Sequence, residues 1–243
     1  MSFSWIIGRL FLEFETQVKN VLSRNYNVKS FRFPRPVSMD FKPGQFMFVT
    51  IRNDGREIQK HFTISSSPTE KEFIEFTKKL TGHPFSNVLE KLRVGDWAKI
   101  DAPHGDFTFS GEFKRVGMLT GGIGITPLRS MCKYCTDSNR DSKITLLYSN
   151  HSEKDIIFRE ELESMQKQNR NLKVIFTTDE HSADWNGYTG RIDADMVKKE
   201  IPDYLETRFY TCGPPSMVEA MNNLLKDMKV NEEHIRKEDF PGY

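Results

Sequence analysis

The sequence predicts two domains, an antiparallel β-barrel over residues 1–112 and a doubly wound α/β domain with a parallel sheet over residues 113–243. Two observations support this division. In the first half, short segments that alternate between apolar and polar residues are separated by turns containing Pro or Gly, a pattern typical of antiparallel sheets. In the second half, short apolar strands alternate with helical segments, which indicates βαβ units.

The first half is a series of short strands with clear turns between them. Alternation predicts strands over residues 15–22, 28–33, 46–51, 72–78 and 97–101. Tight turns are expected at Lys42–Gln45 and Asn53–Arg56, because Pro43 fixes φ and the glycines tolerate positive φ. A short helix is expected over residues 87–92 with Ser86 as its N-cap.

The second half repeats a strand followed by a helix. Short apolar strands are predicted over residues 116–120, 144–148, 172–177 and 208–212. Helices are predicted over residues 128–135, 153–168 and 216–228. Strands arranged in this way form a parallel sheet that has helices on both faces.

Composition and charge exclude several functional classes. A hydrophobic fraction of 37% and a net charge of +1 are ordinary for a globular protein and argue against a nucleic-acid partner. Three cysteines are too few for a disulfide framework, so a reducing, cytoplasmic location is expected. The apolar residues near the start are interrupted by Arg9 and Glu13 and follow no basic segment, so neither a transmembrane segment nor a signal peptide is expected.

The stretch Lys60–Pro68 is the candidate reaction centre. It combines a cation, aromatic Phe62 and four hydroxyl side chains, with Phe62 and Ile64 alternating against Thr63 and Ser65. Such a strand can pack one face in a core and offer donors to a planar cofactor with a phosphate tail. An ordinary strand with a Ser-rich turn accounts for the same residues equally well.

Two glycine-containing turns lie between a predicted strand and a predicted helix. Gly121–Pro127 places glycines where a backbone can approach a pyrophosphate closely, at the start of a helix whose amides are donors. Thr211–Met217 has the same position after the last strand, where Cys212 is either a crevice thiol or a buried apolar residue. The pair Cys132 and Cys135 cannot complete a four-thiolate site, and the histidines lack metal-binding spacing, so no metal is expected.

Taken in order, these motifs resemble the ferredoxin–NADP reductase family, in particular its NAD(P)H-dependent flavin reductases. The resemblance covers most of the chain. Its motifs are Lys60–Pro68, Gly82–Ser86, Gly95-Asp96, Pro103-x-Gly105-x-Phe107, Gly121–Pro127, Gly187-x-x-Gly190-Arg191, Cys212–Met217 and Glu238-x-Phe240.

The resemblance implies an FAD-dependent NAD(P)H oxidoreductase. A hydride would pass from the nicotinamide to the flavin, and electrons would then pass to a separate acceptor, which is an iron–sulfur protein, a flavodoxin, an oxygenase or a small molecule. The alternatives are an electron-transfer subunit of a larger dehydrogenase complex and a nucleotide-binding module without turnover.

The resemblance also assigns roles to individual residues. Catalytic roles fall to Thr63, Cys212, Glu238 and Phe240. FAD would be bound by Lys60, His61, Phe62, Thr63, Lys78, Leu80, Phe85, Ser86 and Phe240, with Tyr243 as a competing candidate for stacking on the flavin. The nicotinamide nucleotide would be bound by Gly121, Gly122, Gly124, Thr126, Pro127, Ser149, Cys212, Gly213 and Pro214.

Three positions depart from the family pattern. The family usually has Arg at Lys60 and often Tyr at Phe62, so a bidentate phosphate contact and a hydroxyl contact are missing. It often has Arg near His151, and the absence of that Arg favours NADH over NADPH.

Overall fold

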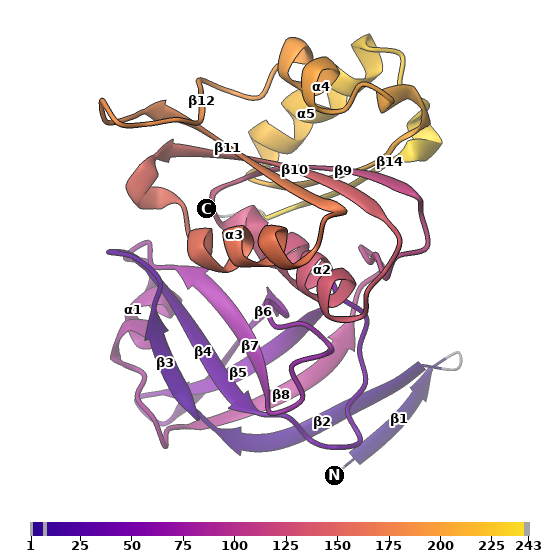
Figure 1. The fold of residues 1–243 in the computed structure, drawn as a ribbon. Helices are drawn as coiled ribbons and strands as arrows, with labels where there is room; N and C mark the ends of the chain where they lie inside the picture. The colour runs from indigo at the N-terminus through magenta and orange to yellow at the C-terminus, as the bar shows by residue number, and fades with distance from the viewer. Residues whose placement is uncertain (1, 7–8, 241–243) are drawn as a thin grey trace. The chain divides into compact units, whose positions relative to one another are not determined.

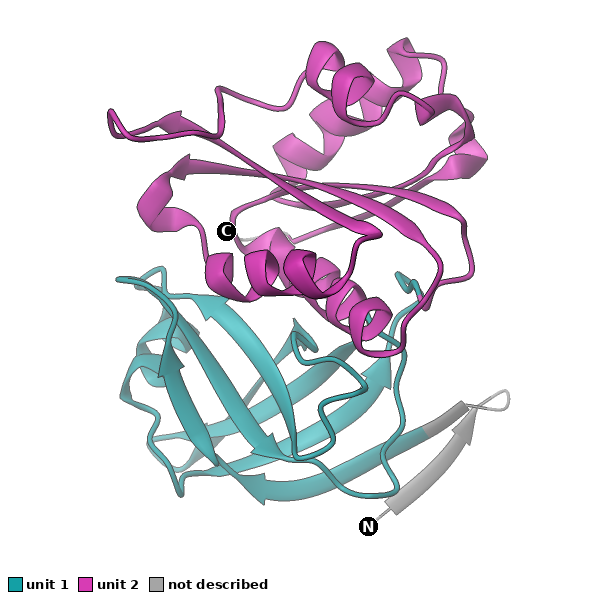
Figure 2. Ribbon diagram, in the orientation of Figure 1, with its two compact units in different colours: residues 1–109 teal, residues 110–243 magenta. Residues whose placement is uncertain are grey.

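The computed structural model describes residues 2–6 and 9–240, with only the backbone described up to residue 10. The chain separates into two compact units, an N-terminal unit ending at Phe109 and a C-terminal unit beginning at Ser110 (Figure 2). Each unit has its own sheets and its own arrangement of strands.

The N-terminal unit consists of antiparallel strands and one helix. Its elements are β1 (Ser2–Ile6), β2 (Arg9–Gln17), β3 (Asn20–Ser23), β4 (Val28–Pro34), β5 (Phe46–Asn53), β6 (Arg56–Thr63), β7 (Phe73–Lys79), α1 (Pro84–Lys91) and β8 (Trp97–His104). The described strands form one sheet in the order β1-β2-β8-β5-β6 and another in the order β3-β4-β7 (Figure 1). The strand pairs in both sheets are antiparallel, as predicted.

One apolar core is shared by both sheets of this unit. Phe31 and Phe33 on β4 stack on Phe76 of β7, with ring centroids 5.0 and 6.0 Å apart. Met47 and Ile51 of β5 belong to the same cluster and are fully buried. Burial of each such side chain stabilises the fold by about 1.5–3 kcal/mol, so the alternating strands are held by the faces that they bury.

The predicted turns are present, but the predicted helix start is wrong. Gly44 has a φ of 100°, and the Gln45 amide donates to the Lys42 carbonyl at 3.2 Å. Helix α1 begins at Pro84 and not after Ser86, with His83 as its N-cap residue. Proline suits the first helical position because its fixed φ is already helical and an amide there has no intrahelical partner.

The C-terminal unit contains the predicted parallel sheet. Its elements are β9 (Arg115–Gly121), η1 (Gly122–Gly124), α2 (Ile125–Asp137), β10 (Lys143–Ser152), η2 (Glu153–Asp155), α3 (Arg159–Gln168), β11 (Leu172–Glu180), β12 (Tyr188–Thr189), α4 (Ala194–Glu200), η3 (Tyr204–Glu206), β13 (Arg208–Gly213), α5 (Pro215–Asp227), η4 (Glu232–His234) and β14 (Ile235–Asp239). The strand order is β12-β11-β10-β9-β13-β14. Figure 1 shows α2 and α3 on one face of this sheet and α4 and α5 on the other.

The strand order reverses direction between β9 and β13. Successive strands after β9 are added on one side as β10 and β11, and the chain then returns to add β13 on the other side. In sheets of this kind, ligands bind at the carboxyl ends of the strands where the order reverses. The two glycine-containing turns lie at this place, after β9 and after β13.

The predicted helix over residues 153–168 is interrupted. Ser152 and Asp155 form a capping box around the short turn η2, and Phe158 then has a φ of 59°, so α3 begins only at Arg159. The first turn of α2 starts at Ile125, three residues earlier than predicted. Pro127 does not prevent this, since a proline within the first turn removes no intrahelical hydrogen bond.

Two negative findings hold for the described part of the chain. No helix there is both long enough and apolar enough to cross a membrane. No group of three or more His, Cys, Asp or Glu side chains in residues 2–6 and 9–240 is arranged to hold a metal ion.

Candidate functional site

Three aromatic rings meet at the end of β6. Phe62 is 7% exposed and stacks on Phe76 of β7, with centroids 4.4 Å apart and planes 13° apart. Phe85, near the start of α1, lies 5.7 Å from Phe62 in a tilted orientation. The structure therefore brings together two of the predicted flavin-binding residues, Phe62 and Phe85, from different elements.

Two lysines accompany these rings. By strand alternation, Lys60 shares a face of β6 with Phe62, and Lys78 shares a face of β7 with Phe76. Burial of Lys78, together with the positive charge of Lys60, lowers the pKa of Lys78 to about 8. A buried ammonium beside a second cation is stabilised by an anion, so the pair fits the diphosphate of a dinucleotide.

The start of α1 adds amide donors. The helix has no side-chain cap, so the amides of Phe85 and Ser86 and the positive end of the helix dipole are available to an anion. Ser86 is buried in this turn, with its Oγ 3.3 Å from Thr81 Oγ1. Leu80 is partly buried against the apolar core just before the loop that leads to the helix.

His61 is not brought together with Lys60 and Phe62. Its ring makes edge contacts with Phe46 and Phe48 of β5, at centroid distances of 5.5 and 6.0 Å. Thr63 is the last residue of β6, pairs with Phe46 and is 7% exposed. A flavin role for His61 stays a prediction, because its ring belongs to a different aromatic group from that of Phe62.

The glycine turn after β9 is packed tightly against the end of β13. A Cβ at Gly124 would lie 2.4 Å from the carbonyl oxygen of Cys212, so only glycine fits there. Gly122 has a φ of 53° and open space around it. The hydroxyl of Thr120 donates to the same Cys212 carbonyl at 2.7 Å. Gly122 and Gly124 thus present only backbone atoms, and the turn lies close to Cys212.

The next residues predicted to bind nucleotide are used mainly inside the fold. Thr126 is buried, and its hydroxyl donates to the Ile123 carbonyl at 3.1 Å. Pro127 is buried in the first turns of α2. Ser149 is half-buried beside the turn, because β10 pairs it with Gly121. Pro214 is half-buried and forms the N-cap of α5.

Cys212 and Glu238 are paired neighbours on β13 and β14. Burial, together with the nearby negative charges of Glu238 and Asp239, raises the pKa of the Cys212 thiol, so it stays a neutral thiol. Burial also raises the pKa of Glu238 to about 7, with a smaller contribution from Asp239. Oε2 of Glu238 is buried and has no hydrogen-bond partner, and the loss of solvation that this burial causes favours the protonated form of the carboxyl.

Phe240 follows directly after β14. Its amide donates to the carbonyl of Gly213 at 3.1 Å, and Gly213 has a φ of 154°. The C-terminal unit therefore gathers Gly121–Gly124, Cys212–Gly213, Glu238 and Phe240 at one edge of its sheet. Tyr243, the alternative aromatic, lies outside the described residues.

Sequence reasoning missed two features near these residues. Tyr148 is fully buried on β10, and its hydroxyl donates to the carbonyl of Gly122 at 2.9 Å. At the ends of β10 and β11, His151 lies 3.9 Å from Asp179 and 3.3 Å from Glu180. A tyrosine within an otherwise apolar strand could have indicated a buried hydrogen bond of Tyr148. The contacts of His151 with Asp179 and Glu180 depend on the pairing of β10 with β11, so no local pattern indicates them.

Comparison with known proteins identifies both units. The oxidoreductase FAD-binding domain matches residues 13–109, and the oxidoreductase NAD-binding domain matches residues 118–223. The chain belongs to the ferredoxin–NADP reductase family. Members of this family are NAD(P)H-dependent flavoprotein reductases, and their cofactors are FAD and a nicotinamide dinucleotide.

Several relatives of this chain are reductases. It is 32% identical to the glycine betaine monooxygenase reductase subunit of Chromohalobacter salexigens, over 98% of this chain and 66% of the relative. It is 29% identical to NADH-cytochrome b5 reductase 1 of Aspergillus terreus, over 90% of this chain and 78% of the relative. The cytochrome b5 reductase domain of Ulva prolifera nitrate reductase superposes with a TM-score of 0.80 at 25% identity, over 94% of this chain and 97% of the other.

The length of the chain differs from that of some relatives. It spans 66% of the Chromohalobacter salexigens reductase subunit and 62% of the corresponding Pseudomonas aeruginosa protein. The two matched domains account for most of this chain.

Proposed function

We propose that this protein is an NAD(P)H-dependent FAD reductase that passes electrons to a separate acceptor. Residues 1–112 would hold FAD, and residues 113–243 would hold the nicotinamide dinucleotide. The observation that carries the proposal is the pair of cations Lys60 and Lys78 beside the rings of Phe62 and Phe85. A planar ring system with a diphosphate tail would contact the rings and the cations at once.

The side chains have distinct tasks in this proposal. Bound FAD would supply the hydride acceptor and the ability to release electrons singly or in pairs. Lys60, Lys78 and the amides at Phe85 and Ser86 bind the diphosphate, and Phe62 packs against the ring.

The reacting edge of the flavin is served by other residues. The hydroxyl of Thr63 donates to the ring edge, and the neutral thiol of Cys212 provides a small, polarisable contact for the nicotinamide. Glu238 holds a proton near neutral pH, since burial raises its pKa to about 7. Phe240, directly after β14, would occupy the place of the nicotinamide until the dinucleotide binds.

We infer that NADH is preferred over NADPH. The carboxylates of Asp179 and Glu180 lie at the carboxyl end of β11 beside His151, two strands from the glycine turn. In α/β dinucleotide sites, an acidic group near the ribose accepts a hydrogen bond from the 2′-hydroxyl of NADH, whereas an Arg binds the 2′-phosphate of NADPH. Two carboxylates at this edge would repel the additional phosphate of NADPH.

The acceptor is inferred to be a separate protein, by analogy with the reductase subunit and the cytochrome b5 reductases among the relatives. A cytoplasmic location is also part of the proposal. It is supported by the three cysteines, all of which are free thiols.

The chromophore of the purified protein tests the proposal. The protein should be yellow or take up added FAD, and anaerobic NADH should bleach it faster than NADPH does. Turnover with an artificial electron acceptor separates a reductase from a nucleotide-binding module. A colourless protein that rejects FAD would contradict the proposal.

A further inference from the structure

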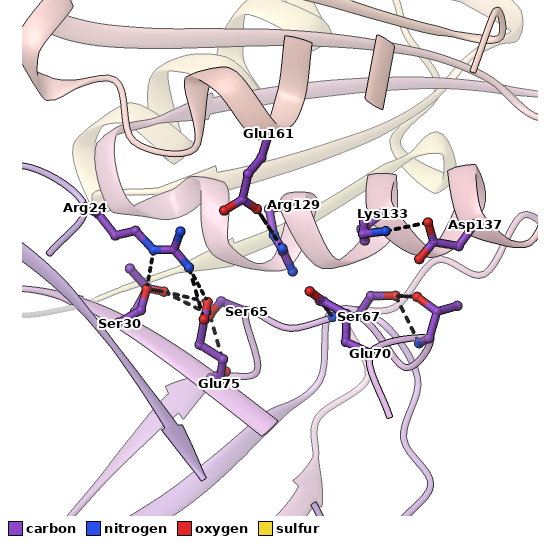
Figure 3. A network of polar contacts seen from close by, with 12 residues as sticks. Arg24, Ser30, Ser65, Ser67, Glu70, Glu75, Arg129, Lys133, Asp137 and Glu161 are labelled. Atoms are coloured by element: carbon purple, nitrogen blue, oxygen red, sulfur yellow. Dashed lines mark hydrogen bonds and ion pairs between the residues drawn. The ribbon is translucent and has the colours of Figure 1, made fainter. Parts of the chain in front are cut away.

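A fully buried carboxylate lies at the centre of the N-terminal unit. Glu75, in the middle of β7, is 0% exposed. It accepts hydrogen bonds from Arg24 Nη2 at 3.1 and 3.0 Å and from Arg32 Nε at 2.7 Å (Figure 3 shows Arg24 and Glu75). A buried carboxylate is tolerated only when it is paired and hydrogen-bonded in this way, and charge-assisted bonds are about twice as strong as neutral ones.

The same residue holds the chain just after Thr63. Ser65 Oγ donates to Glu75 Oε1 at 3.0 Å, and the Ser65 amide donates to the Glu75 carbonyl at 2.8 Å. The Glu75 amide in turn donates to Ser66 Oγ at 3.0 Å. Both serines are fully buried. Their hydroxyls, which the sequence suggested as cofactor donors, are thus used inside the protein.

These contacts join two different sheets. The β5–β6 pairing ends at Thr63, and β7 pairs with β4 in the other sheet. Beyond Thr63 the pairing of β6 with β5 no longer determines the direction of the chain. The hydrogen bonds that join Ser65 and Ser66 to Glu75 take over this role, together with a bond from the Ile64 amide to the Gln45 carbonyl at 2.9 Å.

The network also extends beyond the Lys60–Pro68 stretch, to a serine on the strand next to β7. Ser30 on β4 is fully buried, and its Oγ accepts from Arg24 Nε at 2.7 Å. The hydroxyl of Thr77 lies 2.7 Å from Ser30 Oγ and 2.9 Å from Ser65 Oγ. Ser30 and Ser65 are therefore both fully buried, but Ser65 contacts the Glu75 carboxylate directly, whereas Ser30 reaches it through Arg24 and Thr77.

We propose that Glu75 is a positioning residue for the flavin, acting through Ser65 and Ser66 on the backbone that carries Thr63. The inference rests on the proposed function, since it requires FAD beside Thr63. Arg24 and Arg32 keep the carboxylate charged and oriented, and the carboxylate fixes the end of the flavin strand. The bonds that join Glu75 to Ser65 and Ser66 thus set both the affinity for FAD and the hydrogen bond that Thr63 offers to it.

Ser65→Ala and Ser30→Ala form a matched pair for the test. Each removes one buried hydroxyl from the network, so both should lower the melting temperature to a similar extent. Ser65→Ala should weaken FAD binding about five- to tenfold, the loss expected for one hydrogen bond. It should also change the visible circular dichroism of the bound flavin, whereas Ser30→Ala, which keeps the bonds between Glu75 and both Ser65 and Ser66, should change both properties much less.

Equal effects of the two substitutions on FAD affinity and on the flavin spectrum would overturn the inference, because the network would then be only structural. If Ser65→Ala does not fold, Ser66→Ala replaces it in the comparison with Ser30→Ala. Failure of the unmodified protein to bind FAD is a different result, and it would contradict the proposed function itself.

Discussion

The hydroxyl of Tyr148 donates a hydrogen bond of 2.9 Å to the carbonyl of Gly122, and so ties β10 to the glycine turn that follows β9. Tyr148 is fully buried, and its ring packs near Phe176 of β11 at a centroid distance of 6.2 Å. The turn is therefore held from two sides, since Thr120 and Gly124 connect its other side to the Cys212 carbonyl.

Replacing Tyr148 with Phe should loosen this turn. The free energy of unfolding should fall by about 0.5–1.5 kcal/mol, because the Gly122 carbonyl loses the hydrogen bond from Tyr148 and keeps the one from the Ile125 amide. If the turn binds the dinucleotide, the KM for NADH should rise several-fold while kcat changes little. Steady-state kinetics measure this split. Tyr134→Phe, on the half-exposed side of α2, is the control and should change neither constant; equal effects of both variants would count against a role for the turn.

Gly124→Ala should be far more harmful than Gly122→Ala. At Gly124 the added Cβ would meet the Cys212 carbonyl at 2.4 Å, so the β9 turn and the end of β13 must move apart. At Gly122 there is open space, and only the positive φ is penalised, by about 1–2 kcal/mol. Urea unfolding compares the two variants. A Gly124→Ala protein as stable as Gly122→Ala would show that the two turns are not tightly packed.

Glu238→Gln should change how stability depends on pH. The folded-state pKa of Glu238 is about 7, above the ordinary value of about 4.3. The stability that the protonated carboxyl contributes is therefore fully present below the ordinary pKa. It is lost as pH rises toward 7, which lowers the free energy of unfolding by on the order of 1–3 kcal/mol. The difference in unfolding free energy between the variant and the unmodified protein should grow in favour of the variant between pH 4 and 8, roughly the window set by the two pKa values. A constant difference across that range would mean that Glu238 does not titrate there.

FAD affinity should fall as pH rises above about 8, because the Lys78 ammonium, whose pKa burial lowers to about 8, loses its charge there. Bound diphosphate favours the charged form and raises this pKa, so binding takes up a proton in this range. Lys78→Arg should show a flat affinity up to about pH 10, because the pKa of Arg is much higher and its charge is kept. Fluorescence titration with FAD at several pH values tests this. The same decline in both proteins would place the titrating group elsewhere.

Neutralising the carboxylates at the end of β11 should improve the use of NADPH. In the double variant Asp179→Asn/Glu180→Gln, kcat/KM for NADPH should rise roughly tenfold relative to NADH, since two like charges no longer face the 2′-phosphate. Asp141→Asn is the control, because Asp141 is exposed just before the amino end of β10. If the control gives the same gain, the effect reflects net charge and not the position of Asp179 and Glu180.

Much of the fold could be predicted from local patterns, and the exceptions have physical causes. Strands with a regular buried face, such as β5 and β9, were found because burial alternates or is continuous along them. The sequence pattern does not predict strand β14, because Ile235–Asp239 is mostly charged. This strand lies at an edge of the sheet, where pairing with β13 and not burial stabilises it. Helix α4 is short, and its two buried residues, Met196 and Val197, are too few to give a period.

The candidate site was predictable where glycine or charge determines the geometry. The turn at Gly121–Gly124 was found because glycines that join a strand directly to a helix indicate a close approach of the backbone to a ligand or to another strand. The buried network of Glu75 could not be found, because a charged residue in an apolar strand normally indicates an exposed face. Its partners Arg24 and Ser65 are 51 and 10 residues away in the chain, so only folding reveals that the charge is neutralised.

The burial of all three cysteines has a practical consequence. Burial raises the pKa of each thiol, to about 12 for Cys135, and all three belong to the C-terminal unit. Alkylating reagents attack the thiolate, so modification must wait until this half of the molecule opens. The rate of alkylation would therefore measure how often the C-terminal unit opens, and a bound pyridine nucleotide should slow it.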